Sequence, residues 1–154
     1  MLVSVVIPTY NRLPILQQCL RALEAQLPLD PGDDFEVVLV DDGSTDGTVE
    51  WIQQEAAELP HVRLICQEHG GPAIGRNLGV DHANGEVIIF IDSDLVVVPD
   101  FLQHHLRSLR QAWQRDGDRL CFTYGAVLNT HNFESPESEP HKLSDLSSAY
   151  FATG

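Results

Sequence analysis

Four short apolar runs alternate with segments in which apolar residues recur every three or four positions. The runs cover Leu2–Ile7, Phe35–Val40, Val62–Cys66 and Glu86–Ile91. Nearly continuous β-branched and aliphatic residues are typical of strands that are covered on both faces. The intervening segments have the spacing of amphipathic helices. The alternation predicts an α/β fold with a doubly wound, mostly parallel sheet.

Proline, glycine and small polar residues set the predicted limits of the helices. The first helix is expected from about Leu13 to Leu27, because a proline is tolerated in a first turn and Pro28 follows. Ser44 and Thr45 are the predicted caps of the second helix. Two further helices are predicted, one from Pro72 to Asn84 and one that opens after Pro99.

The regular pattern weakens toward the carboxyl end. Residues Leu120–Leu128 predict a fifth strand, and the segment that follows is rich in Pro, Ser and Glu. Residues 1–128 are therefore expected to form one α/β domain, with residues 129–154 as an irregular tail.

Charge narrows the possible ligands. The 154 residues include 9 Lys and Arg against 23 Asp and Glu, a net charge of -14. Nucleic acid is excluded as a partner, because phosphate backbones are bound by clustered basic residues. A smaller phosphorylated ligand would need a local device such as a metal ion or a helix N-terminus.

The cysteine content and the longest apolar stretch indicate the cellular compartment in which the protein is expected. Three cysteines far apart in the chain do not suit a disulfide framework or a zinc site. The longest apolar stretch, from Val87 to Val98, is interrupted by Asp92 and Asp94, so no membrane span is expected. We expect a cytoplasmic protein, either free or peripheral at the inner face of the membrane.

A pair of carboxylates follows the most apolar predicted strand. Asp92 and Asp94 flank Ser93 there. Two carboxylates so close together repel each other unless a cation neutralises them, and oxygen ligands suit Mg²⁺ or Mn²⁺. The alternative is an ordinary turn in which Asp94 caps a neighbouring helix.

The other predicted strands also end in polar clusters. The first ends at Pro8-Thr9-Tyr10-Asn11-Arg12, the second at Asp41-Asp42, and the third leads to Gly70-Gly71 and then Arg76. Helix capping accounts equally well for the short polar side chains after the first strand. One carboxylate after the second strand could accept a nucleobase N–H or bind ribose, and the other could cap the next helix. Ligands of doubly wound sheets bind at such strand ends.

Four linked motifs resemble those of the family 2 glycosyltransferases, which have the GT-A fold. They are VSVVIPTYNR, VVLVDDGSTDGT, GGPAIGRNLGV and GEVIIFIDSDLVVVPDFL, and they cover about the first 110 residues. The resemblance implies a Rossmann-like sheet with the strand order 3-2-1-4. It also implies an inverting glycosyltransferase that transfers the sugar of a nucleotide-diphosphate sugar, commonly a UDP-sugar, to an unknown acceptor.

The resemblance also assigns residues. Thr9, Asp41 and Arg76 would face the nucleobase, Asp92 the ribose or sugar, and Asp94 the metal. The full set implied for the nucleotide sugar is Pro8, Thr9, Tyr10, Asn11, Asp41, Asp42, Gly71, Arg76, Asp92 and Ser93. Asp94, with Asp92, would hold Mn²⁺ or Mg²⁺.

The sequence departs from the family pattern in several places. His69 stands where Asn is frequent, Gly75 where Ala is frequent, and Leu95 where a third acidic residue often follows. An inverting enzyme also needs a carboxylate base, which the family carries in a later half. No catalytic base is identified here, since the acidic residues Glu134, Glu137 and Glu139 lack apolar support. We therefore expect an incomplete enzyme, with residues 129–154 as a tail or the beginning of its acceptor region.

Two other functions compete with transfer. Whichever function holds, an unfinished domain would leave apolar surface that could drive self-association. One of the two competing functions is a module that binds the nucleotide sugar without catalysis. The other is a haloacid-dehalogenase-like phosphatase, in which Asp92 would be the nucleophile. That chemistry needs a downstream lysine, and Lys142 is the only lysine in the chain.

Overall fold

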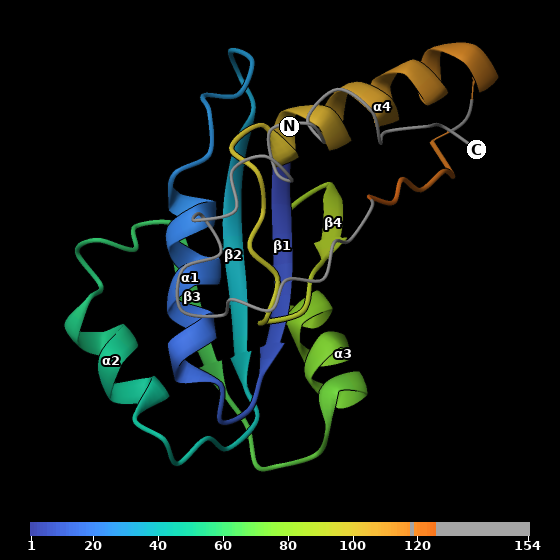
Figure 1. The fold of residues 1–154 in the computed structure, drawn as a ribbon. Coiled ribbons are helices and arrows are strands. Elements are labelled where there is room, and N and C mark those ends of the chain that lie inside the picture. Colours follow the sequence, from blue (N-terminus) through green and yellow to red (C-terminus); the bar gives the residue numbers. More distant parts are fainter. Residues whose placement is uncertain (118, 126–154) are drawn as a thin grey trace. The chain divides into compact units, whose positions relative to one another are not determined.

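The computed structural model describes residues 1–117 and 119–125, which divide into two compact units (Figure 1). The first unit comprises Met1–Ala25 and Asp30–Val96, and the second comprises Gln26–Leu29 and the described residues from Val97 onward. All of the residues predicted to bind a ligand lie in the first unit. The predicted domain limit at 128/129 lies outside the described residues.

The first unit is built on a four-stranded parallel sheet. Its strands are β1 (Leu2–Thr9), β2 (Asp34–Asp41), β3 (Val62–Cys66) and β4 (Val87–Phe90). They lie in the order β3-β2-β1-β4, and every neighbouring pair is parallel. The predicted strand order is confirmed. β1 is buried from its second residue onward, which agrees with its almost uninterrupted apolar sequence.

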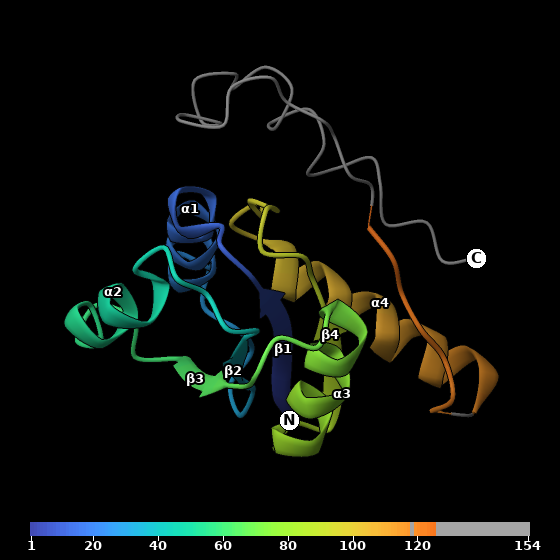
Figure 2. The same ribbon diagram turned by 90° about the horizontal axis from the view of Figure 1, so that it is seen from below.

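Helices cover both faces of this sheet (Figure 2). α1 (Leu13–Glu24) and α2 (Thr48–Gln54) lie on one side, and α3 (Pro72–His82) lies on the other. In α1, Leu16, Leu20 and Leu23 are fully buried at helical spacing. Each such leucine stabilises the fold by roughly 1.5–3 kcal/mol relative to an exposed position.

α3 packs closely on the sheet because it carries small residues toward β1. A Cβ added at Gly79 would overlap the Val6 side chain. Leu78 of the same helix packs against a cluster of fully buried valines, namely Val6, Val38 and Val40. The close approach fixes the helix whose first turn carries Arg76.

Three predicted helix limits were wrong. α3 ends at His82 instead of Asn84, and tertiary contacts explain the other two. α1 ends at Glu24 instead of Leu27, because the Leu27 N–H donates to the Pro99 carbonyl at 2.8 Å, within the second unit. α2 begins at Thr48, whose N–H and hydroxyl both donate to Asp46 Oδ1, at 3.2 and 2.6 Å. Asp46 therefore supports this helix start, and Ser44 and Thr45 do not.

Strand limits differ by one or two residues from the prediction. β1 continues through Pro8 to Thr9. The pairing of β1 with β4 ends at Val6, whose carbonyl accepts the Ile91 N–H at 3.3 Å. Alternate residues of β1 direct their backbone N–H and C=O groups toward β4. Pro8 is one of these residues, but it lies beyond Val6, the last residue paired with β4. The proline therefore removes no ladder hydrogen bond.

The second unit contains α4 (Phe101–Asp116), which confirms the helix predicted after Pro99. Gln26 joins this helix to the short segment before it: its Nε2 donates to the Val98 carbonyl at 2.8 Å and its Oε1 accepts the Leu102 N–H at 3.0 Å. The fifth strand is wrong for residues 120–125, which form no strand. The rest of that prediction, the tail and Lys142 lie outside the described residues.

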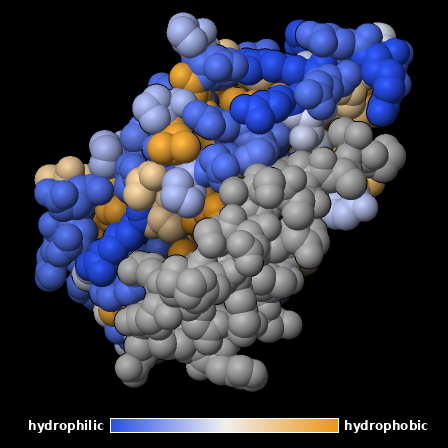
Figure 3. Space-filling model, turned by 45° about the horizontal axis from the view of Figure 1, so that its top comes forward, coloured by the Kyte–Doolittle hydropathy of each residue, from blue (hydrophilic) through white to orange (hydrophobic). Residues whose placement is uncertain are grey.

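The hydrophilic character of the surface agrees with the many charged residues in the sequence. On the face drawn in Figure 3, the described residues are mostly hydrophilic, with smaller hydrophobic patches between them. In the part of the chain that the structure describes, no helix is both long and apolar enough to cross a membrane.

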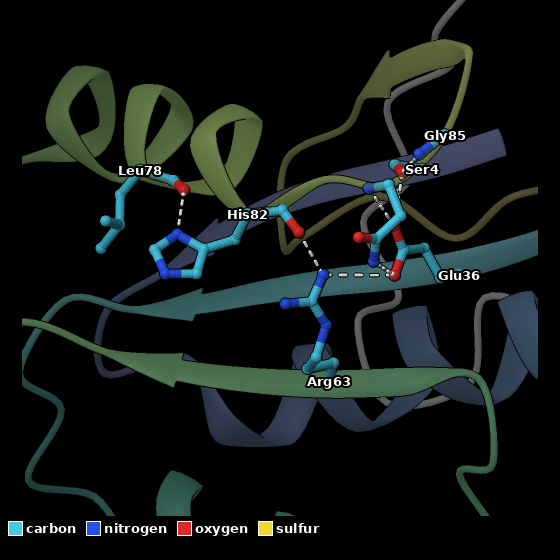
Figure 4. Close-up of polar contacts among 7 residues, drawn as sticks. Ser4, Glu36, Arg63, Leu78, His82 and Gly85 are labelled. Atoms are coloured by element: carbon cyan, nitrogen blue, oxygen red, sulfur yellow. Dashed lines mark hydrogen bonds and ion pairs between the residues drawn. The ribbon is translucent and has the colours of Figure 1, made fainter.

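A polar cluster ties the strands together at their amino-terminal end (Figure 4). Ser4 Oγ donates to Glu36 Oε1 at 2.6 Å and accepts the Gly85 N–H at 2.8 Å. Arg63 bridges Glu36 and the last carbonyl of α3, that of His82. Burial alone would raise the pKa of Glu36, but hydrogen bonds from Ser4, Asn84 and Arg63 outweigh it and hold this pKa below its usual value.

Candidate nucleotide and metal site

The carboxyl ends of the strands lie along the opposite edge of the sheet, at the bottom of Figure 1. Thr9 ends β1 and is the register partner of Asp41, which ends β2. Asp41 in turn lies beside Cys66, the last residue of β3. Asp92 and Asp94 follow β4. The parallel sheet therefore gathers the polar segments singled out in the sequence along one edge.

Thr9 and Asp41 each carry a buried oxygen that no group among the described residues satisfies. The two residues are 3% and 1% exposed. Asp41 Oδ2 accepts the Ser44 N–H at 3.0 Å, whereas Asp41 Oδ1 and Thr9 Oγ1 have no hydrogen-bond partner within residues 1–117 and 119–125. Buried polar atoms are nearly always paired, so two unpaired oxygens on register partners indicate a place where a ligand donates.

Asp42 is used differently from its neighbour. Its Oδ1 accepts the Gly70 N–H at 2.7 Å and Gln67 Nε2 at 2.5 Å, and its Oδ2 accepts the Gly71 N–H at 2.9 Å. Burial would raise the pKa of Asp42, but these hydrogen bonds and nearby His69 keep it below its usual value. Asp42 therefore fixes the glycine loop after β3 and does not cap α2. A direct contact with nucleotide stays a prediction.

An aromatic pair crosses the end of β2. The Tyr10 ring stacks on the His69 ring, with centroids 4.2 Å apart and an interplanar angle of 30°. His69 Nδ1 lies 2.9 Å from Asp42 Oδ2, which holds the imidazole in place. In the sequence, His69 stands out only as a departure from the family pattern, although its position beside two glycines after a predicted strand is a usable signal.

Asn11 locks two loops together. It is the one non-glycine residue with positive φ, 50°, among those the structure describes. Its N–H donates to Ser44 Oγ at 2.9 Å, and its Oδ1 accepts the Thr45 N–H at 2.7 Å. The loop after β1 thus holds the loop after β2, which explains why Ser44 and Thr45 do not cap α2.

Two glycines shape the approach to Arg76. Gly71 has φ of 92°, a conformation that side chains disfavour, and it directly precedes α3. A Cβ at Gly75 would lie 3.2 Å from Pro8 Cβ, so this position leaves little room for the alanine frequent in the family. Pro8 itself is buried, with its ring against α3. Arg76 follows in the first turns of this helix.

The two carboxylates after β4 each hold an arginine. Arg76 pairs with Asp92, and Arg12 Nη1 lies 2.7 Å from Asp94 Oδ2. Ser93, between them, is buried. The pKa of the Cys19 thiol in α1 is raised to about 12, mainly because the thiol is buried and to a smaller extent because of the negative charge of Asp94. The ion pair with Arg12 was not foreseen from the sequence.

The donor set suits a hard divalent cation that is shared with a ligand. Asp92 and Asp94 offer carboxylate oxygens, which Mg²⁺ and Mn²⁺ prefer, and both side chains are accessible, at 59% and 40% exposure. Within the described residues no group of three His, Cys, Asp or Glu could hold a metal ion. An ion bound here would therefore complete its coordination with ligand oxygens and water.

Comparison with known proteins places this geometry in a family context. Residues 4–129 match the family "Glycosyl transferase family 2". The "Uncharacterized glycosyltransferase YfnE" of Bacillus subtilis is 34% identical over 105 residues, which cover 68% of this chain and 26% of YfnE.

Solved structures agree. The structure "S. aureus TarS 1-349 in complex with UDP-GlcNAc" superposes with a TM-score of 0.63 at 32% identity, over 72% of this chain and 32% of that chain. The "Mannosyltransferase PcManGT from Pyrobaculum calidifontis in complex with GDP-Man and Mn2+" has a TM-score of 0.63 at 29% identity, over 85% and 36%. The chain thus spans about a quarter to just over a third of these proteins. It belongs to glycosyl transferase family 2 and has the α/β fold of its GT-A members.

Proposed function

We propose that this chain binds a nucleotide-diphosphate sugar together with a divalent metal ion, as the donor-binding part of a glycosyltransferase. The observation that carries the proposal is a pair of buried oxygens, Thr9 Oγ1 and Asp41 Oδ1, which have no partner among the described residues. They lie at the edge that also carries Asp92 and Asp94. Donors on a ligand would satisfy these oxygens. The two similar structures described above are complexes with UDP-GlcNAc and with GDP-Man and Mn²⁺, which supports this assignment.

The nucleobase is proposed to bind over the ends of β1 and β2. Asp41 Oδ1 is a strong acceptor, and a uracil ring presents an N–H that matches it. The Thr9 hydroxyl can donate to a base carbonyl or accept a second N–H. The exposed Tyr10 ring, stacked on His69, supplies an aromatic face beside this place. We therefore favour a UDP-sugar as donor.

The diphosphate is proposed to lie toward Asp92 and Asp94. A protein with a net charge of -14 repels a diphosphate, so a cation at Asp94 would be needed to offset that repulsion. When bound, Mn²⁺ or Mg²⁺ would neutralise the charge that develops on the leaving diphosphate as the glycosidic bond breaks. Asp92 would then hold ribose or sugar hydroxyls, and Arg76, which pairs with Asp92, would lie beside this part of the ligand.

Sugar transfer also needs an acceptor and, for inversion, a base that removes the acceptor proton. Asp41, Asp92 and Asp94 would all contact the donor, so we propose that the base comes from another part of a longer protein. A binding-only role is the second candidate, because the chain spans about a quarter to just over a third of the similar proteins described above. Slow release of the sugar from UDP-GlcNAc would favour catalysis, and tight binding without any release would favour the binding module.

The metal is tested by UDP titration of the wild type and Asp94→Asn, each with Mn²⁺ and with a chelator. Asn keeps the size of the side chain and removes its charge, so the variant isolates the electrostatic part of the site. We expect Mn²⁺ to strengthen UDP binding by the wild type at least tenfold, and Asp94→Asn to lose most of this gain, about the scale of one charged contact. Equal UDP affinity under all four conditions would contradict the metal site.

Because the chain belongs to glycosyl transferase family 2, the alternative of a haloacid-dehalogenase-like phosphatase is dropped. Location in the cytoplasm, contact with the inner face of the membrane and self-association stay predictions. Exposed Ile74 and Phe90, on α3 and β4, are apolar side chains through which copies could associate.

A further inference from the structure

The Arg12–Asp94 pair joins two loops that are remote in sequence. Arg12 lies directly before α1, and Asp94 lies 82 residues later, after β4. One guanidinium nitrogen, Nη1, approaches Asp94 Oδ2 to 2.7 Å, and the two side chains are 55% and 40% exposed. The contact is thus a well-formed but solvent-screened ion pair, which another ion or ligand can replace at modest cost.

The position of this guanidinium coincides with the proposed site of the metal. Asp94 is the carboxylate to which the metal role was assigned, and one of its two oxygens already accepts a cationic donor. Asp92 has a similar contact with Arg76. A divalent ion that takes Asp94 as a ligand must therefore separate it from Arg12 or share it with that arginine.

We propose that Arg12 neutralises Asp94 until a metal ion binds there. The metal ion displaces the Arg12 guanidinium from Asp94, and the guanidinium then binds the nucleotide diphosphate. The inference rests on the proposed function and adds a role for Arg12 within it. Guanidinium groups bind phosphate and carboxylate oxygens with similar forked geometry. Binding of diphosphate therefore gives Arg12 a new partner, and the ligand and metal bind cooperatively.

The experiment measures Mn²⁺ binding to the whole 154-residue chain by electron paramagnetic resonance, first without nucleotide and then with saturating UDP. The variants are Arg12→Gln, Arg12→Lys and Arg21→Gln. Arg21 is exposed near the end of the same helix, so Arg21→Gln removes an equal charge from α1 without touching Asp94. It controls for the general increase in negative charge.

We expect Arg12→Gln to bind Mn²⁺ roughly two- to fivefold more tightly than Arg21→Gln without nucleotide, the effect of one exposed ion pair. With UDP the difference should shrink, because the diphosphate has then engaged Arg12. Arg12→Lys should bind Mn²⁺ much as the wild type does, since it keeps the charge.

Equal Mn²⁺ affinities of Arg12→Gln and Arg21→Gln without nucleotide would overturn the inference, as would the absence of detectable Mn²⁺ binding by Arg12→Gln. The proposed function fails separately, if the wild type does not bind UDP in the presence of Mn²⁺. A protein that binds UDP with Mn²⁺ but shows no specific effect of Arg12 would keep its function and lose only this role.

Discussion

The sheet carries similar polar side chains at the amino-terminal and the carboxyl-terminal ends of its strands, but these side chains differ in whether their oxygens have hydrogen-bond partners. At the amino-terminal edge, both oxygens of Glu36 accept hydrogen bonds, and the Ser4 hydroxyl both donates and accepts. At the carboxyl-terminal edge, Asp41 Oδ1 and Thr9 Oγ1 are buried without a partner in the part of the chain that the structure describes. Ser4 and Glu36 are register partners, as are Thr9 and Asp41, so the same two strands supply both pairs.

Because of this difference, one end of β1 and β2 is expected to stabilise the fold, and the other end is expected to bind a ligand. The Glu36 cluster holds the end of α3 to the sheet through Arg63, so its hydrogen bonds act within the protein. The oxygens at the other end are desolvated without compensation, which is unfavourable until a ligand donates to them. Equivalent substitutions at the two edges should therefore have opposite consequences.

The largest expected effects come from removing one carboxylate at each edge. An amide has a single oxygen, so Asp41→Asn cannot accept both from the Ser44 N–H and from a base. We expect UDP affinity to fall about 10- to 100-fold, the scale of a hydrogen bond to a charged group. Glu36→Gln loses an acceptor inside the protein, and should lower the free energy of unfolding by roughly 1.5–3 kcal/mol.

Calorimetric UDP titration and urea unfolding of both variants measure these two quantities. Asp41→Asn should unfold close to the wild-type midpoint, and folded Glu36→Gln should bind UDP with nearly wild-type affinity. A Glu36→Gln variant that loses UDP binding while it remains folded would show that the two edges are not separable.

The pH dependence of unfolding sharpens the same comparison. The pKa of Glu36 lies below its usual value of 4.5 in the folded protein, because its hydrogen bonds outweigh the opposing effect of burial. Its contribution is therefore complete above about pH 4.5 and is lost as the pH falls from there through the folded pKa. In urea unfolding between pH 7 and 3, the wild type should lose more stability than Glu36→Gln over this acidic range. Parallel curves would mean that the Glu36 cluster does not stabilise the carboxylate.

The positions of the strands could be predicted from the sequence because apolar runs are local signals, and their order was implied by the family resemblance. All four strands of the first unit were found, in the right order. Helix limits were less accurate where distant residues compete for the ends. Nothing near Leu27 shows that its N–H will bond to Pro99, and nothing near Ser44 shows that Asn11 will engage it.

The site was predictable as a set of positions, but the individual roles were not. Asp41 and Asp42 are adjacent and chemically identical, and their roles differ because one ends a strand and the other faces the glycine loop. Only the fold shows that Asp42 accepts hydrogen bonds from Gly70 and Gly71 while one oxygen of Asp41 remains unpaired. The ion pair of Arg12 with Asp94 depends on loop geometry, which no local pattern encodes.

The smallest expected effects, and the closest control, come from two hydroxyls of β1. Thr9 and Ser4 are both buried, at 3% and 0% exposure, and lie at opposite ends of the strand. Ser4→Ala removes the partner of the Gly85 N–H and of Glu36, and should reduce the free energy of unfolding by about 1–2 kcal/mol. Its effect on UDP binding should be negligible.

Thr9→Val keeps the shape of the side chain and replaces a hydroxyl that has no partner within residues 1–117 and 119–125. Because an unpaired buried hydroxyl is unfavourable, the valine variant should unfold at the same urea concentration as the wild type or a higher one. The same change removes a contact with the ligand, so UDP affinity should fall about three- to tenfold, the range of one neutral hydrogen bond. Unfolding and titration of Thr9→Val beside Ser4→Ala give four measurements from one strand. A Thr9→Val variant that is destabilised as much as Ser4→Ala, with unchanged UDP affinity, would show that Thr9 Oγ1 serves the fold and that no ligand donates to it.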